Sequence, residues 1–439
     1  MKVKRIEIQN FKGIVEANID FNSDLNVFIG SNGAGKTTIL EAIVANIYKF
    51  TSQFAAVNKF QRLHTTSEHI NYNASFYKVD LVVTFAEIGE VLITQTKGFL
   101  SGEELIKDEK FQKFTTHFSQ RLEENETVPI IKYYPSSSVT YTGHTNPPQK
   151  VYRTAQLEAW ANLLHDDIAY SKLFRWFVDY EVRELRKQRD ATDFEIELTE
   201  LKHVREAISK ALKILKGKDY IIKSDEIKRK GNHSLIPVLT LQEKGNGRTE
   251  ILDNKSDGEK AVITLIADIA YNLSIAHGAA DTTDYLVSPG IVLIDEIEAH
   301  LHPNWQREII PLLRQLFPNI QFFITTHSPQ VIASVNSENI FLCENFEFSK
   351  INIKSKGLDS NSLLKYVFNA TERPRRYVDL IEQFEALMEQ EVEIEKLEAV
   401  IDKVKILEQE DQGTDVSQLV SELELQLEAY KFDMAHEVD

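Results

Sequence analysis

The chain has 439 residues, of which 42% are hydrophobic and 27% charged, so a disordered or collagen-like chain is excluded and a sizeable core is expected. Its 50 Lys and Arg residues stand against 67 Asp and Glu residues, giving a net charge of −17. This charge argues against a protein that binds duplex DNA over most of its surface, although it permits one local basic patch.

Cysteine content and hydropathy indicate the compartment. The single cysteine, Cys343, excludes an internal disulfide and a zinc site built on several thiolates. The N-terminal residues alternate charged and apolar side chains and lack the apolar core of a secretory signal. No stretch approaches the roughly 18 uninterrupted apolar residues of a membrane span. We therefore expect a soluble, cytoplasmic protein without membrane contact.

The first 50 residues predict a nucleotide-binding unit. Residues 3–8 and 15–21 alternate like two short strands around a turn at FKG. A buried strand over residues 25–29 leads into the eight residues GSNGAGKT at 30–37, and a helical pattern follows over 38–50. This strand–loop–helix order is the context in which G-x-x-x-x-G-K-[ST] forms a P-loop.

The P-loop supplies the candidate nucleotide ligands. Backbone N–H groups of such a loop surround the phosphates, and the following helix N-terminus favours anions. Lys36 is placed to reach the β- and γ-phosphates, and the Thr37 hydroxyl is placed to bind Mg²⁺. The candidate nucleotide-binding residues of this loop are Asn32, Gly33, Ala34, Gly35, Lys36, Thr37 and Thr38.

A pair of acids marks a second part of the site. The apolar run at 291–294 predicts a buried strand, and Asp295 and Glu296 follow it directly. Asp295 suits a role in the Mg²⁺ shell, acting through water, and Glu296 suits orienting and deprotonating the attacking water. An acidic pair that only caps the next helix is the alternative, and the P-loop upstream favours the catalytic interpretation.

A histidine follows the next predicted strand. Residues 321–326 form another apolar run, which ends at His327, Ser328 and Pro329. The carboxyl ends of strands in an α/β sheet form the ligand-binding edge. A single histidine after a strand is often structural, but as the third element in this order His327 is predicted to sense the γ-phosphate.

A Ser-x-Gly-Glu turn lies between these motifs. Ser256, Gly258 and Glu259 precede a helical pattern over 261–276. The turn can present a hydroxyl and free N–H groups to an anion. The same spacing of Ser256 and Glu259 is also a capping box. The sequence does not separate these two functions, and both can hold.

Along the chain the four motifs follow the order P-loop, Ser-x-Gly-Glu, Asp-Glu and His, and in this order they resemble the ABC-type ATPase heads of the SMC, RecF and OLD families. Residues 295–332, DEIEAHLHPNWQREIIPLLRQLFPNIQFFITTHSPQVI, closely resemble the Walker B, D-loop and H-loop region of those heads. The resemblance implies an α/β fold, namely an ABC-type P-loop ATPase head with an inserted helical lid and a C-terminal helical extension. It also implies ATP and Mg²⁺ as cofactors, and a head-to-tail dimer in which Ser256 of one chain contacts the γ-phosphate held by Lys36 of the other. Lys12, in NFKG, matches a basic residue that approaches the nucleotide in such heads, but a solvated turn lysine explains it equally well.

Missing features narrow the resemblance. The residues after Pro329 contain no D-x-D of a Toprim nuclease, and residues 45–250 contain no sustained heptads of an SMC coiled coil. Residues 174–177, FRWF, with Glu181 and Glu184, and the tract GLDSNSLL at 357–364, resemble PtuA-type ATPases of Septu systems and certain retrons. Those ATPases work with a separately encoded HNH nuclease, PtuB.

We therefore expect four parts and one function. Residues 1–150 and 236–356 would form the two parts of the head, 151–235 a helical lid, and 357–439 a helical partner or oligomerisation region broken at DQGTD, residues 411–415. The expected function is an ATP-hydrolysing homodimer or higher homo-oligomer that regulates a PtuB-like HNH nuclease in anti-phage defence.

Two other functions compete with this one. A RecF-like repair ATPase would bind DNA directly, with a possible contact through the basic residues of the lid at 183–189 and 202–216, although a solvated helix face explains that charge as well. A transporter subunit is disfavoured by the long insertion and by the RecF-like tract at 295–332.

Overall fold

The structure is a computed structural model that describes most of the chain. The described residues are 1–54, 67–98, 103–106, 109–136, 156, 160, 170–228, 235–277, 285–351, 375–389, 394–411 and 414–436. Contacts divide the chain into two compact units, Met1–Ser360 and Asn361–Asp439. The GLDSNSLL tract lies outside the described residues.

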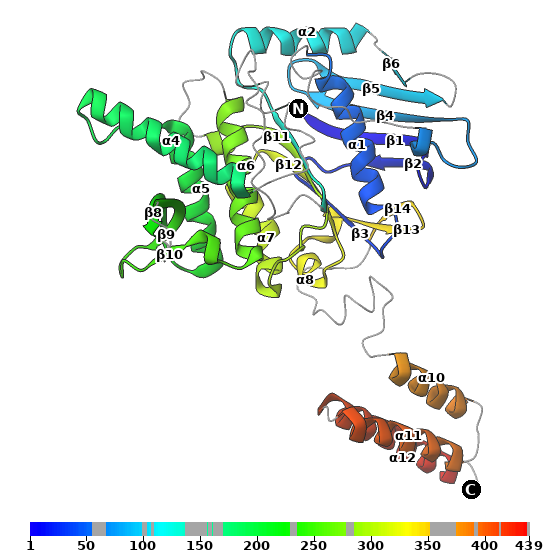
Figure 1. Cartoon of the computed structure of the whole chain (residues 1–439). Coiled ribbons are helices and arrows are strands. Elements are labelled where there is room, and N and C mark those ends of the chain that lie inside the picture. Colours follow the sequence, from blue (N-terminus) through cyan, green and yellow to red (C-terminus); the bar gives the residue numbers. More distant parts are fainter. Residues whose placement is uncertain are drawn as a thin grey trace. The chain divides into compact units, whose positions relative to one another are not determined.

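A six-stranded sheet carries the predicted motifs (Figure 1). Its strands, in spatial order, are β14 (Glu347–Lys350), β13 (Ile340–Glu344), β3 (Leu25–Ile29), β12 (Ile320–Thr326), β11 (Gly290–Ile294) and β7 (Ile130–Tyr134). All neighbours are parallel except the edge strand β14. Every residue of β3, β11 and β12 is buried, as expected for parallel strands covered on both faces. The α/β class and the three buried strands predicted from the sequence are confirmed.

The register of this sheet brings four strand ends to one level. Ile294 on β11 pairs with Tyr134 on β7 and with Ile324 on β12. Thr326, at the end of β12, pairs with Ile29 at the end of β3. The residues that follow these strands therefore share the carboxyl edge of the sheet, where α/β proteins bind ligands.

A second, antiparallel sheet completes the N-terminal part. Its order is β2 (Ile14–Asp20), β1 (Lys2–Phe11), β4 (Phe76–Phe85), β5 (Gly89–Gly98) and β6 (Glu103–Ile106). The alternation at 3–8 and 15–21 predicted β1 and β2 correctly. The helix α1 (Lys36–Thr51) contacts strands of both sheets and buries residues around most of its circumference, as a helix enclosed by two layers must.

The helix α2 (Glu109–Glu123) packs against β5 and was not predicted. Its buried side chains Phe111, Phe114 and Phe118 recur at helical spacing, so the signal was present. The Phe114 ring lies 4.6 Å from that of Phe50 on α1, and Phe118 also contacts Trp160. This aromatic cluster fixes α2 to the end of α1.

The inserted lid contains strands as well as helices. Two helices, α4 (Tyr170–Ala191) and α5 (Thr199–Lys216), precede a three-stranded antiparallel sheet of order β10 (Thr249–Ile251), β9 (Leu235–Glu243) and β8 (Tyr220–Lys228). Within the expected helical lid of residues 151–235, α4 and α5 are helical and β8 is a strand that was not predicted. Three helices follow: α6 (Asp257–Ala276), α7 (Pro303–Leu316) and α8 (Pro329–Ile332). Helix α6 contacts α4, α5 and β7, so it joins the lid to the edge of the parallel sheet.

Two buried glutamates hold the lid together. Glu181 and Glu184 of α4 both accept hydrogen bonds from the Arg205 guanidinium of α5, at 2.7 and 2.8 Å. Glu181 also accepts the Ser224 N–H of β8 at 2.8 Å, and Glu184 accepts the Leu198 N–H at 2.8 Å. Glu181 and Glu184 thus join the two helices, their connecting turn and β8.

The C-terminal unit is helical. Its helices are α10 (Arg375–Glu389), α11 (Ile394–Asp411) and α12 (Thr414–His436). Their core includes Phe384 of α10, Leu397 and Val404 of α11, and Leu423 of α12. The predicted break near 411–415 falls between α11 and α12, and α10 ends at Glu389, so the described part of this unit has three helices. In the described residues no helix is long and apolar enough to cross a bilayer.

Replacing Arg205 tests the lid. Arg205→Ala leaves two buried carboxylates without their cation, and we expect the free energy of unfolding to fall by about 3 kcal/mol. The matched control is Arg183→Ala, because its pair with Asp179 is exposed, with side-chain exposures of 57% and 70%, and is worth at most about 1 kcal/mol. Urea unfolding followed by circular dichroism measures both. An equal loss in the two variants would contradict the role of Arg205.

Candidate active site

The P-loop follows β3 and is enclosed by the turn between β13 and β14. Gly35, with φ 105°, is the N-cap of α1, in a conformation that favours glycine. A side chain at Gly30 would place its Cβ 2.2 Å from the Cys343 carbonyl oxygen. The Phe346 N–H donates to the Ala34 carbonyl at 3.1 Å, and the Phe346 ring lies over Gly35. These contacts hold the P-loop against the turn between β13 and β14.

Burial also makes the adjacent cysteine inert. It raises the pKa of the Cys343 thiol to about 12, against a smaller opposing effect of Lys36. The thiol therefore stays protonated at neutral pH, and only thiolates are strong nucleophiles. Cys343 has a packing role and takes no part in the chemistry of the site.

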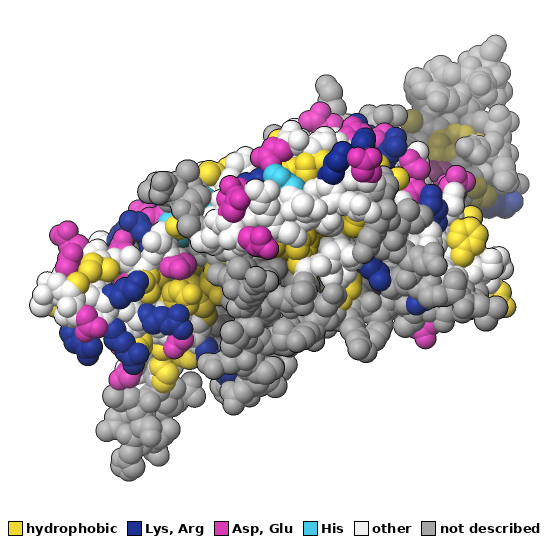
Figure 2. All heavy atoms as spheres, turned by 90° about the horizontal axis from the view of Figure 1, so that it is seen from above, with side chains coloured by type: hydrophobic (Ala, Val, Ile, Leu, Met, Phe, Trp, Pro, Cys, Tyr) yellow, Lys and Arg dark blue, Asp and Glu magenta, His cyan; other side chains and the backbone are white. Residues whose placement is uncertain are grey.

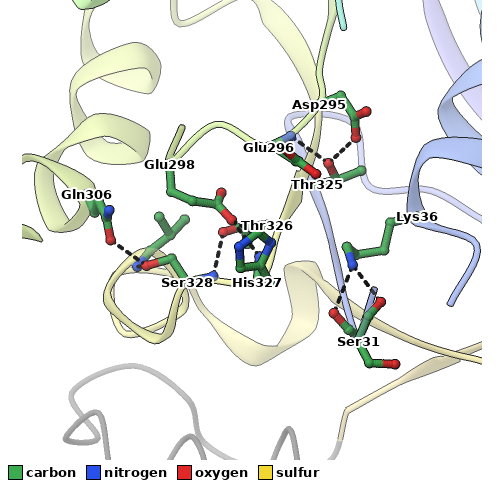
Figure 3. A network of polar contacts seen from close by, with 12 residues as sticks. Ser31, Lys36, Asp295, Glu296, Glu298, Gln306, Thr325, Thr326, His327 and Ser328 are labelled. Carbon is green, nitrogen blue, oxygen red and sulfur yellow. Dashed lines mark hydrogen bonds and ion pairs between the residues drawn. The ribbon is translucent and has the colours of Figure 1, made fainter. Parts of the chain in front are cut away.

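Lys36 lies at the centre of the loop. Its ammonium group donates to the carbonyl oxygens of Gly30 and Ser31, both at 2.8 Å (Figure 3). Asn32 and Gly33 are exposed beside it, whereas Ala34 and Gly35 are buried. Phosphate oxygens would compete for the same ammonium donors, so this arrangement fits an anion at the loop. Thr38 is half-buried in the first turn of α1.

Thr37 and Asp295 meet across the sheet edge. The Thr37 hydroxyl donates to the Asp295 carboxylate, with distances of 2.9 and 3.1 Å to its two oxygens. The Thr325 hydroxyl of β12 also donates to Asp295, and the Asp295 N–H donates to the Tyr134 carbonyl at 2.8 Å. Hydroxyl and carboxylate oxygens are hard donors, which suit Mg²⁺. Among the described residues no group of three or more His, Cys, Asp or Glu could hold a metal ion.

Glu296 has an unusual backbone. Its φ is 52°, in the left-handed region that costs a non-glycine residue energy. Its N–H donates to the Thr325 hydroxyl at 2.8 Å, so the residue that holds Asp295 also holds Glu296 (Figure 3). Glu296 lines a small pocket with Tyr134, Ser136 and Ala261, between the end of β7 and the start of α6. A strained backbone held in this way typically marks a functional position.

His327 follows β12 and is held by Glu298. The Glu298 carboxylate accepts the His327 N–H at 2.8 Å, and the same oxygen lies 3.1 Å from the imidazole Nδ1 (Figure 3). The imidazole is 49% exposed, so its other nitrogen is accessible to a ligand. Ser328 caps α8, and its hydroxyl donates to Gln306 of α7 at 2.6 Å.

The signature turn is a complete capping box. Ser256 is the N-cap of α6, its hydroxyl accepts the Glu259 N–H at 3.3 Å, and the Glu259 carboxylate accepts the Ser256 N–H at 3.3 Å. Burial opposes the charge on Glu259, but an ion pair with Lys216 of the lid outweighs it, so the pKa of the Glu259 carboxyl lies below its usual value. Ser256 itself is exposed, and the cap does not preclude anion binding.

Gly258 is needed for close packing. A Cβ on Gly258 would lie 2.3 Å from the His300 carbonyl oxygen, so the signature turn lies directly against the turn that follows Glu296.

Lys12 is not part of the signature turn or of the turn that follows Glu296. Its ammonium group forms an ion pair with Glu41 on α1, one turn beyond the P-loop, and its φ of 50° places it in a tight turn.

The structure thus brings five predicted residues to one sheet edge: Lys36, Thr37, Asp295, Glu296 and His327. Ser256, Gly258 and Glu259 pack on the neighbouring turn and the lid instead. Three residues that support the site were not predicted: Thr325, Glu298 and Phe346. Thr325 and Glu298 lie within two residues of a predicted one, which is a usable signal, whereas nothing in the sequence around Phe346 pointed to the P-loop.

The sheet, the P-loop and the motif order define a P-loop ATPase head of the ABC type. The family AAA_21, described as "AAA domain, putative AbiEii toxin, Type IV TA system", matches residues 25–333, and the chain belongs to this family.

Curated relatives agree with the predicted PtuA-type resemblance. The chain is 28% identical to the "Retron Ec83 probable ATPase" of Escherichia coli, over 88% of this chain and 80% of that protein. It is 24% identical to "Septu protein PtuA" of Bacillus thuringiensis, over 90% of this chain and 92% of that protein. Among solved structures, it is similar to the SmcHead bound to the C-winged helix domain of ScpA, with 14% identity, a TM-score of 0.49, and coverage of 81% of this chain and 98% of that structure. The resemblance to PtuA-type ATPases is confirmed.

Replacing Thr325 tests how the site is held. Thr325→Val keeps the shape of the side chain but leaves the Glu296 N–H without its acceptor, and we expect a loss of about 1–3 kcal/mol in the free energy of unfolding. The control is Thr115→Val on α2, where an exposed hydroxyl bonds only its own helix. Thermal unfolding measures both variants, and wild-type stability of Thr325→Val would show that the hydroxyl is dispensable.

Proposed function

We propose that this chain is an ATP-hydrolysing switch of anti-phage defence, which dimerises around ATP and controls a separately encoded HNH nuclease of the PtuB type. The names of its relatives, Septu protein PtuA and retron ATPases, support the defence context. The observation that carries the ATPase function is the meeting of the P-loop with Asp295 and Glu296 at one sheet edge.

Each residue at the edge has a role in hydrolysis. Lys36 and the N-terminus of α1 would balance the phosphate charge. Thr37 and Asp295 would hold Mg²⁺, which supplies charge neutralisation on the phosphates when bound. Glu296 would accept the proton of the attacking water. His327 would donate a hydrogen bond to the transferred phosphoryl group, where charge develops.

The sheet order supports a composite site. The P-loop follows β3, whereas α6 begins at the signature turn and packs on β7, which is three positions from β3 in the sheet. Strands lie about 4.8 Å apart, so these two elements are separated by roughly 14 Å of sheet. We therefore propose that Ser256 and Gly258 meet the phosphates held by the P-loop of a second chain. Lys12 is proposed to lie at the periphery of the same nucleotide site.

The proposed parts of the chain follow this division. We assign the head to residues 1–150 and 236–356, the lid to 151–235, and a partner or oligomerisation region to 357–439. In the C-terminal unit, Ile406 and Leu425 are 57% and 70% exposed, so both apolar side chains are accessible to a partner.

Direct DNA binding by the lid has less support. Figure 2 shows Lys and Arg side chains at the left-hand end, the side on which Figure 1 shows α4, mixed with acidic side chains. Arg205 is bound to Glu181 and Glu184, Lys213 to Asp219, and Lys216 to Glu259. These three cations are thus already paired with acidic side chains of the same chain.

The glutamate assignment has a direct test. Glu296→Gln should bind ATP with wild-type affinity but release phosphate at least about 100-fold more slowly, because the general base is lost. Lys36→Ala should lose ATP binding itself. A fluorescent ATP analogue measures affinity, and phosphate release measures turnover. Full turnover by Glu296→Gln would refute the assignment.

The composite site predicts nucleotide-dependent dimers. In the Glu296→Gln background, ATP should shift the protein toward dimers, or toward larger assemblies, in analytical ultracentrifugation. Adding Ser256→Arg should abolish the shift without affecting ATP binding, because the arginine enters only the second chain's site. Thr115→Arg on α2 is the surface control. An unchanged shift in Ser256→Arg would exclude this interface.

A further inference from the structure

A buried glutamate other than Glu296 connects the residues that follow strand β11 to those that follow strand β12. Glu298 lies in the turn after β11, and its side chain is only 8% exposed. Its two contacts both reach the residue that follows β12: the His327 N–H at 2.8 Å and the His327 Nδ1 at 3.1 Å. In Figure 3 the Glu298 side chain extends from its turn directly to the His327 ring.

We propose that Glu298 is a positioning residue, which fixes the orientation and the tautomer of the His327 imidazole before ATP binds. An ionised carboxylate can only accept hydrogen bonds. Nδ1 must therefore carry a proton. Nε2 lies on the opposite, accessible side of a ring that is 49% exposed, and it donates to the phosphoryl group in the imidazolium, which carries a proton on both nitrogens. This proposal deepens the proposed function and rests on the assignment of His327 to the phosphoryl group.

The turn that carries Glu298 is rigid. The turn begins after Glu296 and ends near His300. The φ values of these two residues, 52° for Glu296 and 64° for His300, both lie in the left-handed region. The Ile297 N–H donates to the Thr325 carbonyl at 3.2 Å, and the Leu301 N–H donates to the Glu298 carbonyl at 2.9 Å. Because the turn is bonded to β12 and to itself, it fixes where the Glu298 carboxylate lies. The same turn therefore fixes the position of His327 relative to that of Glu296.

The second oxygen of Glu298 argues against a purely structural acid. Oε2 is buried and, within the described residues, has no hydrogen-bond partner in the structure. Burying a carboxylate without satisfying both oxygens costs free energy. A carboxylate retained only for folding would be expected to have partners on both oxygens, whereas one that must aim an imidazole needs only the oxygen that faces it.

Loss of Glu298 should slow turnover more than it weakens binding. Removing a group that orients an active-site imidazole typically costs about 10- to 100-fold. We expect Glu298→Ala to lower kcat by that factor, with ATP affinity within about twofold of wild type. Glu298→Gln should recover most of the loss, because its amide oxygen can still accept from the backbone N–H and from Nδ1–H.

A double-mutant cycle separates positioning from general damage. If Glu298 acts through His327, then Glu298→Ala should add nothing to His327→Ala, since the ring it orients is already absent. Gln306→Ala is the matched control, because the Gln306 side chain bonds the adjacent Ser328 and the Leu301 carbonyl and not the ring. It should leave kcat near wild type. Additive losses from Glu298→Ala and His327→Ala would overturn the proposal.

A readout independent of activity is the histidine tautomer. In protein labelled with ¹⁵N-histidine, the signal missing from His327→Ala identifies His327, and NMR then reports which ring nitrogen is protonated. We expect the Nδ1–H tautomer in wild type and in Glu298→Gln, and a mixture in Glu298→Ala. The same tautomer in all three would overturn the proposal. If His327→Ala kept full turnover, the His327 role in the proposed function would fail, while this spectrum would still decide whether Glu298 orients the ring.

Discussion

The parallel register of β3, β12 and β11 is the constraint on which the site depends. Ile29, Thr326 and Ile294 lie near one level of the sheet, so the loops that follow them emerge together. A side chain as short as Thr37 can therefore reach Asp295, although the two residues are separated by 258 positions in the sequence. A slip of one residue in any of these strands would reverse its faces and move its loop. The buried, apolar strands thus determine the chemistry indirectly, by fixing which loops meet.

Thr325 extends this constraint from strands to side chains. Its hydroxyl donates to Asp295 and accepts the Glu296 N–H, so one side chain of β12 orients both acids that follow β11. Glu298 makes the reverse connection, from the turn after β11 to the residue after β12. Each strand end therefore positions a side chain that follows the neighbouring strand. In such a network the geometry of Glu296 and that of His327 cannot vary independently.

The sequence predicted the parts of this molecule that depend on local patterns. The P-loop, the strands at 291–294 and 321–326 and the capping box at Ser256 each follow from a short motif, and the structure contains them all. The helix α2 was missed although Phe111, Phe114 and Phe118 have helical spacing. The strand β8 was missed because its residues were grouped with the preceding helices. The packing of Phe346 on Gly35 could not have been predicted, since it depends on a tertiary approach between residues 311 positions apart. The functional roles of the predicted site residues remain proposals that the variants above test.

The buried cysteine beside the P-loop has a practical consequence. Cys343 is the only cysteine in the chain, it is fully buried, and its high pKa keeps it as an unreactive thiol. Maleimide and related reagents attack exposed thiolates. A single cysteine introduced on the lid or on the C-terminal helices would therefore be labelled selectively in the native protein, with Cys343 left in place. Two such cysteines, one on the lid and one on the C-terminal helices, would carry a pair of fluorophores that follows movements during an ATP cycle, without disturbing the strand that supports the nucleotide loop.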